Sequence, residues 1–469
     1  MDLFDDTIIA PATASGGAIA VIRVSGQNAL RFTDQIFTGR TPLSSAPGYS
    51  LHFGSIREPD GSLLDEVVVS VFRAPHSYTG ENAAEIACHG SEYIVSRILA
   101  LLLAEGARMA APGEFTQRAF VGGKMDLSQA EAVSDLIAAQ TATAQRIALK
   151  QLKGGFSEEL AGMRKQLLHL ASLMELELDF SEEEVEFANR AELQNLVTSV
   201  LGHTEKLIDS FRLGNAIKNG VPVAIVGNTN SGKSTLLNAL LGENRAIVSD
   251  IAGTTRDTIE ETCNLEGVLF RFIDTAGLRE SDDTIERIGI ERAYEKLAAA
   301  QLVLAMLDLT APLSDVMASA NDIAARTSVE QILVFLLNKV DAVSAEAVSA
   351  VQQALSPLLS VPGRRSFVIS SKSGDGLEEL KHSLAAAWRN LTDAAETTLV
   401  SNARHLEALR NADVALRRVK DGLSPESPVP TDLLAQDLRE CLYYLGSIVG
   451  EVSNNEILTN IFSRFCIGK

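Results

Sequence analysis

The sequence predicts a multidomain protein: an N-terminal α+β domain, an all-α helical domain, and an α/β domain inserted into the helical one. The first 120 or so residues combine β-type runs such as 66–72 with glycine and proline breaks. Helical periodicity follows over about 128–213 and returns over 405–416, while residues 216–384 alternate strands with helices. The expected domains are therefore 1–122, 123–215, 216–384 and 385–469, of which the second and fourth are two parts of one helical domain.

The helical pattern is clearest in a stripe of apolar residues spaced mostly three or four apart: Leu160, Met163, Leu167, Leu170, Leu173 and Met174. This spacing places them on one face of a helix, so they predict a packed core and no ligand site. The acidic stretch 179–186 interrupts the pattern and reads as a solvated turn, a helix start or a contact for a switch segment.

A phosphate-binding loop is predicted at residues 227–234, GNTNSGKS, between the apolar run 221–226 and the helix-type run 235–241. The glycines let successive backbone N–H groups face the phosphates. Lys233 can reach the terminal oxygens, and the Ser234 hydroxyl can ligate magnesium.

Three further motifs follow apolar runs: DTAG at 274–277, NKVD at 338–341 and SSK at 370–372. Asp274 at a strand end can hold magnesium, and the Gly277 N–H can sense the terminal phosphate. Asp341 can accept from N1 and the exocyclic amine of guanine, a donor pair that adenine lacks. The motifs therefore predict a GTP site at the carboxyl ends of a mostly parallel sheet.

The group that orients the attacking water stays open on the residues alone. Ras-type GTPases carry a glutamine after Asp-x-x-Gly, but here the residue is Leu278, which cannot hydrogen-bond through its side chain. The segment 253–257 supplies a threonine for magnesium, and Asn230 could face a monovalent cation that neutralises transition-state charge as an arginine finger does. The acidic candidates downstream are Glu280, Asp282, Asp283, Glu286 and Glu291.

These motifs resemble the MnmE, or TrmE, family of tRNA-modifying GTPases, within the TrmE-Era-EngA-YihA-Septin-like superfamily. The resemblance rests on GTTRD at 253–257, DTAGLRE at 274–280 and CIGK at 466–469, and on N-terminal segments at 16–26, 77–82, 111–120 and 124–132. It implies a folate-binding N-terminal domain and a Ras-like P-loop GTPase domain. One departure is Asn228-Thr229, where family members commonly carry Arg-Pro or Lys-Pro.

The resemblance implies a potassium ion held by Asn230, Ser249, Ile251 and Thr254, and a magnesium ion held by Ser234, Thr255 and Asp274. Glu286 would orient the attacking water through a second water, so the catalytic set is Glu286, Asn230, Thr254, Thr255 and Cys466. The implied GTP contacts are Asn230, Ser231, Gly232, Lys233, Ser234, Thr235, Ser249, Asp250, Ile251, Ala252, Gly253, Thr254, Thr255, Asp274, Thr275, Ala276, Gly277, Asn338, Lys339, Asp341, Ser370, Ser371 and Lys372.

The implied folate ligands are Arg23, Glu81, Lys124 and the last residue, Lys469. A carboxylate suits the amide-like donors of a pterin, and cations suit the glutamate tail of a folate. Taken singly, Arg23 and Lys124 read as ordinary surface cations. Cys466 belongs to the tail that the family places in the folate site; a one-carbon adduct on its thiol and a structural or substrate-orienting role both stay open.

The family's activity implies potassium-dependent GTP hydrolysis by a homodimer that forms through the N-terminal domains and pairs its GTPase domains on GTP. An FAD-dependent MnmG-like partner, in a heterotetramer or larger complex, would join it on tRNA. Together they would place a 5-aminomethyl or 5-carboxymethylaminomethyl group at C5 of the wobble uridine, position 34. Methylene-tetrahydrofolate would supply the carbon, and the 5-formyl form is a further expected ligand of the same site.

Two alternatives compete. A ribosome-assembly GTPase of the Era or Der type should carry a basic RNA-binding module or a second GTPase unit, and neither is evident in the sequence. A folate-dependent one-carbon transferase with a merely regulatory GTPase is the other alternative.

Charge and composition limit the partners. The net charge of −20 and pI near 4.9 oppose nucleic-acid binding over the whole surface, so any tRNA contact is expected to be local or shared with a partner. The N-terminus lacks signal-peptide character and no apolar run is long enough to span a membrane, so a cytoplasmic location is expected. The four cysteines show no Cys-x-x-Cys spacing.

Overall fold

The computed structural model describes residues 5–14, 16–179, 190–242, 260–273, 297–298, 300–393, 398–424, 429–451, 458, 461–463, 465 and 468. Within it the chain forms two compact units. One comprises residues 1–137, 150–193 and 422–469, and the other residues 138–149 and 194–421. Each unit is described separately.

The first unit contains a seven-stranded sheet in the order β3-β4-β5-β6-β2-β1-β7, antiparallel except between β1 and β7. Its elements are β1 (Ile8–Pro11), β2 (Ile19–Ser25), α1 (Ala29–Ile36), β3 (Phe37–Gly39), the 3₁₀ turn η1 (Leu43–Ser45), β4 (Ser50–Arg57), β5 (Leu63–Phe72), β6 (Ala83–His89), α2 (Glu92–Ala104), β7 (Arg108–Met109) and α3 (Glu114–Val121). The predicted strand at 66–72 is confirmed within β5.

The two faces of this sheet differ. In β5 the alternate residues Val67, Val69 and Val71 are buried, and they pack in a core with the apolar faces of α1 and α2. Val68, on the opposite face, is exposed. Because strand side chains alternate between faces, this sequence gives a sheet with one covered face and one open face.

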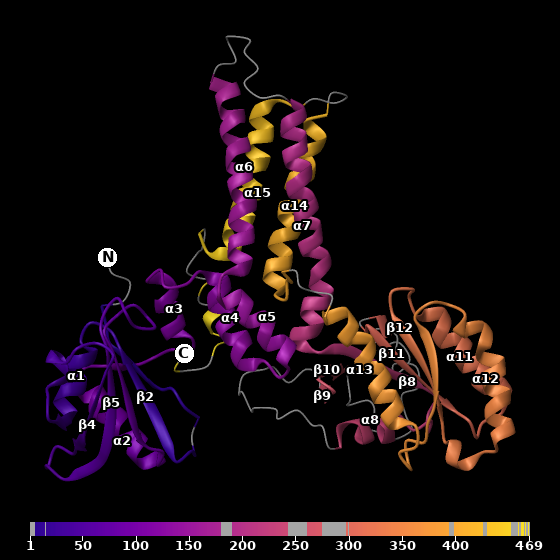
Figure 1. Ribbon diagram of the computed structural model, residues 1–469, viewed down its shortest axis with the longest axis horizontal. Coiled ribbons are helices and arrows are strands. Elements are labelled where there is room, and N and C mark those ends of the chain that lie inside the picture. Colours follow the sequence, from indigo (N-terminus) through magenta and orange to yellow (C-terminus); the bar gives the residue numbers. More distant parts are fainter. Residues whose placement is uncertain are drawn as a thin grey trace, which may run out of the picture. The chain divides into compact units, whose positions relative to one another are not determined.

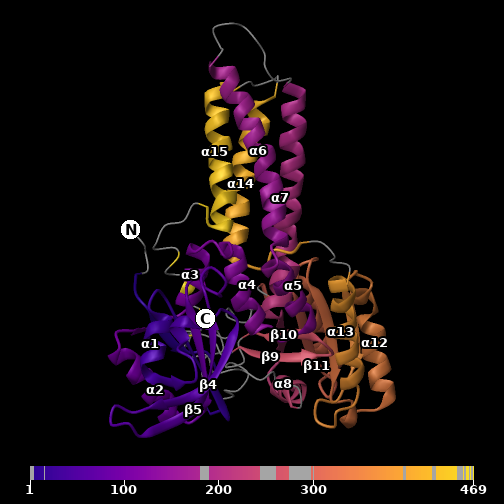
Figure 2. The same ribbon diagram turned by 60° about the vertical axis from the view of Figure 1, so that its left-hand side comes forward.

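Four more elements complete the first unit or border it: α4 (Leu127–Ala138), α5 (Ala142–Leu152), α6 (Gly155–Asp179) and α15 (Thr431–Val449). Helices α6 and α15 pack side by side in both views (Figure 1, Figure 2). The predicted stripe on α6 is buried at Leu160, Met163, Leu167, Leu170 and Met174, whereas Leu173 is half-buried.

The second unit contains a six-stranded sheet in the order β13-β12-β11-β8-β10-β9, parallel except for the β9–β10 hairpin. The predicted mostly parallel sheet is therefore confirmed. The elements are α7 (Arg190–Asn219), β8 (Val221–Gly227), α8 (Lys233–Leu241), β9 (Glu261–Leu265), β10 (Val268–Phe272), β11 (Leu302–Asp308), α11 (Leu313–Arg326), β12 (Ile332–Asn338), the 3₁₀ turn η3 (Val340–Ala342), α12 (Ala345–Leu359), β13 (Arg364–Val368), α13 (Leu377–Asp393) and α14 (Ala403–Gly422).

Helices cover both faces of this parallel sheet. α8 and α13 pack in one hydrophobic core, and α11 and α12 pack in the other. Strands β11 and β12 read as nearly continuous apolar runs because both of their faces are buried. Among the described residues, no helix is long and apolar enough to cross a membrane.

Candidate functional site

The phosphate loop follows β8 directly and leads into α8 (Figure 1). Its backbone is left-handed at Asn230 (φ 60°) and Gly232 (φ 103°). A side chain at Gly232 could not be accommodated, because a Cβ there would lie 2.3 Å from the amide nitrogen of Asn338. The loop therefore depends on a glycine at this position, and it ends at a helix N-terminus, where backbone N–H groups favour an anion.

Lys233 lies folded over this loop. Its ammonium donates to the carbonyl oxygens of Gly227 (2.9 Å) and Asn228 (2.8 Å), and burial lowers its pKa. Among the described residues no carboxylate pairs with it. A half-buried cation that is balanced only by carbonyl dipoles suits an incoming phosphate, which would supply the missing negative charge.

Asn338, at the end of β12, connects the phosphate loop to the loop after β13. Its side-chain nitrogen donates to the Ser231 carbonyl (2.7 Å), and its side-chain oxygen accepts from the backbone N–H (2.9 Å) and hydroxyl (3.0 Å) of Ser371. Asn338 is 2% exposed, so all three bonds are shielded from water. The two loops are thus held in one arrangement.

Asp341 and Lys339 flank this connection. The Ser370 hydroxyl donates to the Asp341 carboxylate (2.6 Å), and this hydrogen bond is the main reason that the pKa of Asp341 is lowered. Lys339 is left-handed (φ 69°) and forms an ion pair with Asp308 (2.6 Å) at the end of β11. An oriented, ionised carboxylate beside the loop that begins at Ser370 is the arrangement that guanine recognition needs.

The described part of the chain therefore brings together Asn338, Lys339, Asp341, Ser370 and Ser371 with the phosphate-loop residue Ser231. Thr235 and Ser234 lie in the first turn of α8, and Lys372 follows Ser371 in the loop after β13. Sequence reasoning missed Asp308, whose only signal was its place at the end of an apolar run. The predicted residues that lie outside the described residues are Ser249, Asp250, Ile251, Ala252, Gly253, Thr254, Thr255, Asp274, Thr275, Ala276, Gly277 and Glu286.

A second cluster lies in the N-terminal part of the first unit, called the N-terminal unit below, around Arg23 on β2. Its guanidinium pairs with Glu85 (2.8 Å), donates to the Gly468 carbonyl (3.2 Å) and lies over the rings of Tyr78 and Phe115. The C-terminal tail therefore reaches Arg23, one of the residues that the resemblance implies as folate ligands. Cys466 and Lys469 lie outside the described residues.

Glu81 is fixed from two sides. The Ser25 hydroxyl donates to one carboxylate oxygen (2.7 Å), and Arg118 donates to the other (3.0 Å). The Arg118 side chain is 1% exposed. Lys124 lies nearby, because its side chain is 3.4 Å from the Cβ position of Gly80, and its ammonium donates to the Pro75 carbonyl (3.0 Å).

Sequence reasoning missed Arg118 and Ser25 as members of this cluster. Arg118 lies four residues after Glu114 on α3, and the two form a buried ion pair (3.0 Å). The pattern Glu-x-x-x-Arg was visible, but burial of both charges was not. Among the described residues, no group of three or more His, Cys, Asp or Glu side chains could hold a metal ion.

A phosphate loop connected through Asn338 to an oriented aspartate defines the class of P-loop GTPases. Two family models match the chain: the GTP-binding protein TrmE N-terminus over residues 7–124 and the MnmE helical domain over residues 127–466. The chain belongs to the MnmE family of tRNA modification GTPases.

The relatives match along the whole chain. It is 51% identical over 470 residues to the tRNA modification GTPase MnmE of Parabacteroides distasonis, covering 99% of this chain and 100% of that protein. It is 50% identical over 471 residues to the protein of the same name from Bacteroides thetaiotaomicron, covering 99% of each. The G domain of the T. maritima FeoB iron transporter is 27% identical, with a TM-score of 0.25, over 35% of this chain and 97% of that chain.

Proposed function

We propose that this protein hydrolyses GTP in a potassium-dependent manner and uses that cycle to modify C5 of the tRNA wobble uridine with an FAD-dependent MnmG-like partner. The product would carry a 5-aminomethyl or 5-carboxymethylaminomethyl group. The observation that carries the GTPase part is the hydrogen bond from Asn338 to Ser231, which joins base recognition to phosphate binding. The full-length match to tRNA modification GTPases supports the tRNA part.

In the hydrolysis step the chain's residues position charge and water. Lys233 would exchange its two carbonyl partners for phosphate oxygens, while Asp341, held by Ser370, would bind guanine. Glu286 would orient the attacking water through a second water. Such positioned groups act mainly by electrostatic stabilisation of the transition state.

Two metal ions complete the proposal. Ser234, Thr255 and Asp274 would hold magnesium, and Asn230, Ser249, Ile251 and Thr254 would hold potassium. The described members fit: Ser234 lies in the first turn of α8, and Asn230 is exposed with a left-handed backbone in the same loop. Potassium, when bound, would add positive charge beside the phosphates, as an arginine finger does.

The N-terminal cluster is the proposed folate site, with Arg23, Glu81, Lys124 and Lys469 as ligands and Cys466 beside them. Glu81 offers an oriented carboxylate to a pterin, since Ser25 and Arg118 fix both of its oxygens. Lys124 is a cation without a carboxylate partner among the described residues, so it can pair with a folate glutamate. Methylene-tetrahydrofolate, when bound, would supply the one-carbon unit, and the partner's FAD the redox chemistry.

Homodimer formation through the N-terminal units is supported by the open face of the seven-stranded sheet. Leu51 and Phe53 on β4 are 72% and 67% exposed, and Ile19 on β2 is 66% exposed. Phe53 pairs across the strands with Val68, which is also exposed, so the apolar residues of β4 and β5 form one surface. Exposed apolar surfaces of this kind mark protein interfaces.

Size-exclusion chromatography tests the dimer proposal. Phe53→Glu should shift the full-length protein from dimer to monomer, because a charge cannot be buried in an apolar interface without a partner. Tyr93→Glu, at an exposed position on α2 against the covered face, should stay dimeric. A dimeric Phe53→Glu protein would remove this surface from the proposal.

Mass analysis of wobble uridines tests the whole proposal. Cells that lack the gene should lose the modified nucleoside, the wild-type gene should restore it, and Asp274→Ala should not. Unchanged nucleosides in the null strain would refute the pathway. The loss of tRNA modification with intact ribosome profiles would separate this function from ribosome assembly.

A further inference from the structure

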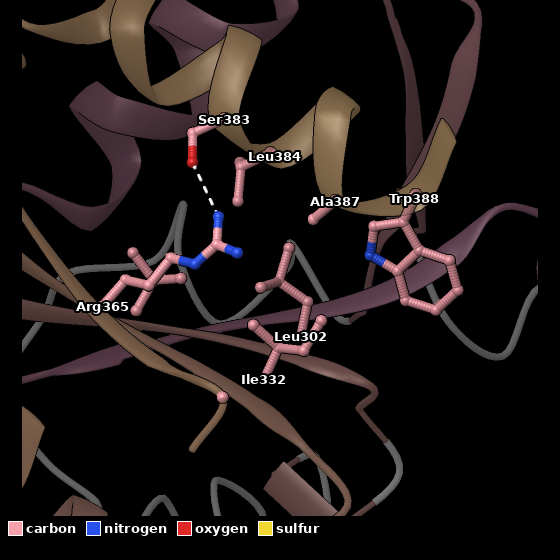
Figure 3. Close-up of a pocket in the computed structure, with 9 residues that line it drawn as sticks. Leu302, Ile332, Arg365, Ser383, Leu384, Ala387 and Trp388 are labelled. Atoms are coloured by element: carbon pink, nitrogen blue, oxygen red, sulfur yellow. Dashed lines mark hydrogen bonds between the residues drawn. The ribbon is translucent and has the colours of Figure 1, made fainter. Parts of the chain in front are cut away.

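A cavity lies at the end of the parallel sheet opposite the nucleotide loops. It is enclosed by α13 and by the starts of the strands, since Leu302 is the first residue of β11 and Ile332 the first of β12. It encloses about 390 Å³ of empty space, including the part open to solvent. Its lining is Leu302, Ile332, Val334, Gly363, Arg365, Ser383, Leu384, Ala387 and Trp388 (Figure 3).

The walls are apolar, but a hydrogen-bond donor lies at each end. Trp388 is 6% exposed, and its indole N–H is buried and has no hydrogen-bond partner among the residues that the structure describes. Figure 3 shows this nitrogen on the side of the ring that faces Ala387 and Leu302. A buried N–H without a partner is costly, so it indicates a missing acceptor.

At the other end, Arg365 donates to the Ser383 hydroxyl (3.2 Å) and is exposed. In the described part of the chain, no aspartate or glutamate lines the cavity and Arg365 forms no ion pair. The cavity therefore offers a cation at its mouth, an apolar middle and an uncharged donor inside. This set of groups selects against cations and favours an apolar anion with a second acceptor atom.

We propose that this cavity is an effector site for a small, apolar carboxylic acid. The carboxylate pairs with Arg365 beside Ser383, the hydrocarbon body contacts Leu302 and Leu384, and a carbonyl or similar acceptor takes the Trp388 N–H. This site is separate from the nucleotide site and from the proposed folate site.

The cavity shares its walls with the elements that hold the guanine base. Helix α13 begins at Leu377, directly after the loop 370–376, and β12 runs from the cavity to Asn338. Gly376 packs tightly: a Cβ there would lie 2.3 Å from the Val368 carbonyl, so a shift of α13 moves this loop against β13. Trp388 also lines a second hollow with Ala216 and with Val221, which lies on β8, the strand that leads into the phosphate loop. An occupant is thus placed to alter nucleotide release.

Trp388 is the single tryptophan of the chain, so the tryptophan fluorescence of the protein reports on this site alone. The probe is 4-acetylbenzoate, which carries a carboxylate and a carbonyl at opposite ends of a ring. Titration of the full-length protein, with N-acetyltryptophanamide as the optical control, should give saturable quenching with a Kd of about 1 mM, as expected for a ligand of a dozen atoms. Benzoate, which lacks the carbonyl, and acetophenone, which lacks the charge, should each bind at least about fivefold more weakly.

Calorimetric titration of three variants with 4-acetylbenzoate tests whether the ligand binds in this cavity. Melting temperatures confirm that each variant is folded. Trp388→Phe keeps the ring and removes the N–H, so it should weaken 4-acetylbenzoate about fivefold. Arg365→Gln should weaken it about tenfold. Arg326→Gln removes the same charge from exposed α11, outside the cavity, and should bind like wild type.

Release of a fluorescent GDP analogue tests the effector role. Saturating 4-acetylbenzoate should change the release rate about fivefold in the wild type and in Arg326→Gln. In Arg365→Gln the concentration that gives half of this change should be about tenfold higher, in line with its weaker binding. The proposal is overturned by absence of quenching at 10 times the expected Kd, roughly 10 mM. It is also overturned by equal affinity in wild type, Trp388→Phe and Arg365→Gln, or by binding that leaves GDP release unaltered.

Discussion

The side-chain nitrogen of Asn338 donates a hydrogen bond to the backbone carbonyl of Ser231 over 2.7 Å, and both residues are buried. Asn338 is the last residue of β12, and Ser231 belongs to the loop after β8. Because the Asn338 side-chain oxygen also accepts from Ser371, the residue fixes the phosphate loop relative to the loop after β13.

Asn338→Ala should weaken both folding and nucleotide binding. The substitution leaves the Ser231 carbonyl and the Ser371 N–H buried without partners, which should lower the free energy of unfolding by about 3 kcal/mol. GDP affinity should fall at least about 30-fold, because the loops lose their common support. Urea unfolding and calorimetric titration with GDP measure the two effects.

Asn219→Ala is the matched control, since Asn219 is exposed at the end of α7 and bonds through its side chain to Asn215. It should change both quantities by less than about 0.5 kcal/mol. If Asn338→Ala bound GDP as well as Asn219→Ala does, the phosphate loop would not depend on this contact.

Gly468→Ala should release the C-terminal tail from the N-terminal unit. Gly468 has φ 95°, and a Cβ there would lie 2.2 Å from the Pro11 carbonyl, so alanine cannot keep the contact. Because Arg23 donates to the Gly468 carbonyl, the tail would leave the proposed folate site. Wobble-uridine modification should fall at least about tenfold while GTP hydrolysis stays within about twofold of the wild-type rate.

Gly61→Ala separates this contact from backbone strain. Gly61 also has a left-handed backbone, with φ 85°, but nothing lies within 4 Å of its Cβ position. It should cost about 1 kcal/mol of stability and leave modification intact. Full modification by the Gly468→Ala protein would show that the tail acts without this docking.

The sequence predicted the GTPase domain well because its motifs are local. Gly227 and Asn338 end strands whose apolar runs identify them, and Lys233 follows in the loop and helix after β8. A parallel sheet brings such strand ends together whatever the helices between them. The ion pair between Lys339 and Asp308 was not predicted, since it joins two strand ends through a side-chain geometry that no motif records.

The N-terminal cluster was harder to predict. Arg23, Glu81 and Lys124 were assigned by resemblance, and the Lys124 side chain lies 3.4 Å from the Cβ position of Gly80, the residue before Glu81. Arg118 was missed because charged residues are ordinarily solvated, and its burial arises from partners that are distant in sequence: Asp6 and Glu81. Long-range charge pairing of this kind leaves no periodic signal.

Acid should destabilise the N-terminal unit through Glu114. Burial alone would raise the pKa of Glu114, but hydrogen bonds from Arg108, the Ala111 N–H and Arg118 outweigh it, and the pKa lies below 4.5. A carboxyl whose folded pKa is lowered contributes stability that is present above the unfolded pKa and lost as the pH falls through the folded one. Stability should therefore decline as the pH falls below about 4.5.

Glu114→Gln tests this charge directly. It should lower the free energy of unfolding by about 3 kcal/mol at pH 7, because Arg118 stays buried with one partner fewer, and it should flatten the decline below pH 4.5. Glu92→Gln, at an exposed position on α2, should keep the wild-type profile. Urea unfolding at pH 7, 5, 4 and 3.5 measures the profiles. Identical slopes for the three proteins would exclude Glu114 as the acid-sensitive group.

Asn230→Gly should remove the response of GTP hydrolysis to potassium. Asn230 has a left-handed backbone (φ 60°), which glycine adopts without strain, so the substitution removes the side-chain oxygen and preserves the loop. The wild-type rate should be at least about tenfold higher in potassium than in sodium at equal ionic strength, because one charge-stabilising contact is worth at least that factor. Asn230→Gly should hydrolyse GTP at the slow sodium rate in both salts, with GDP affinity within about threefold of wild type.

Asn228→Gly, in the same loop, is the control and should keep the potassium response. A potassium response that survives in Asn230→Gly would place the cation elsewhere, and equal wild-type rates in the two salts would remove the cation from the mechanism.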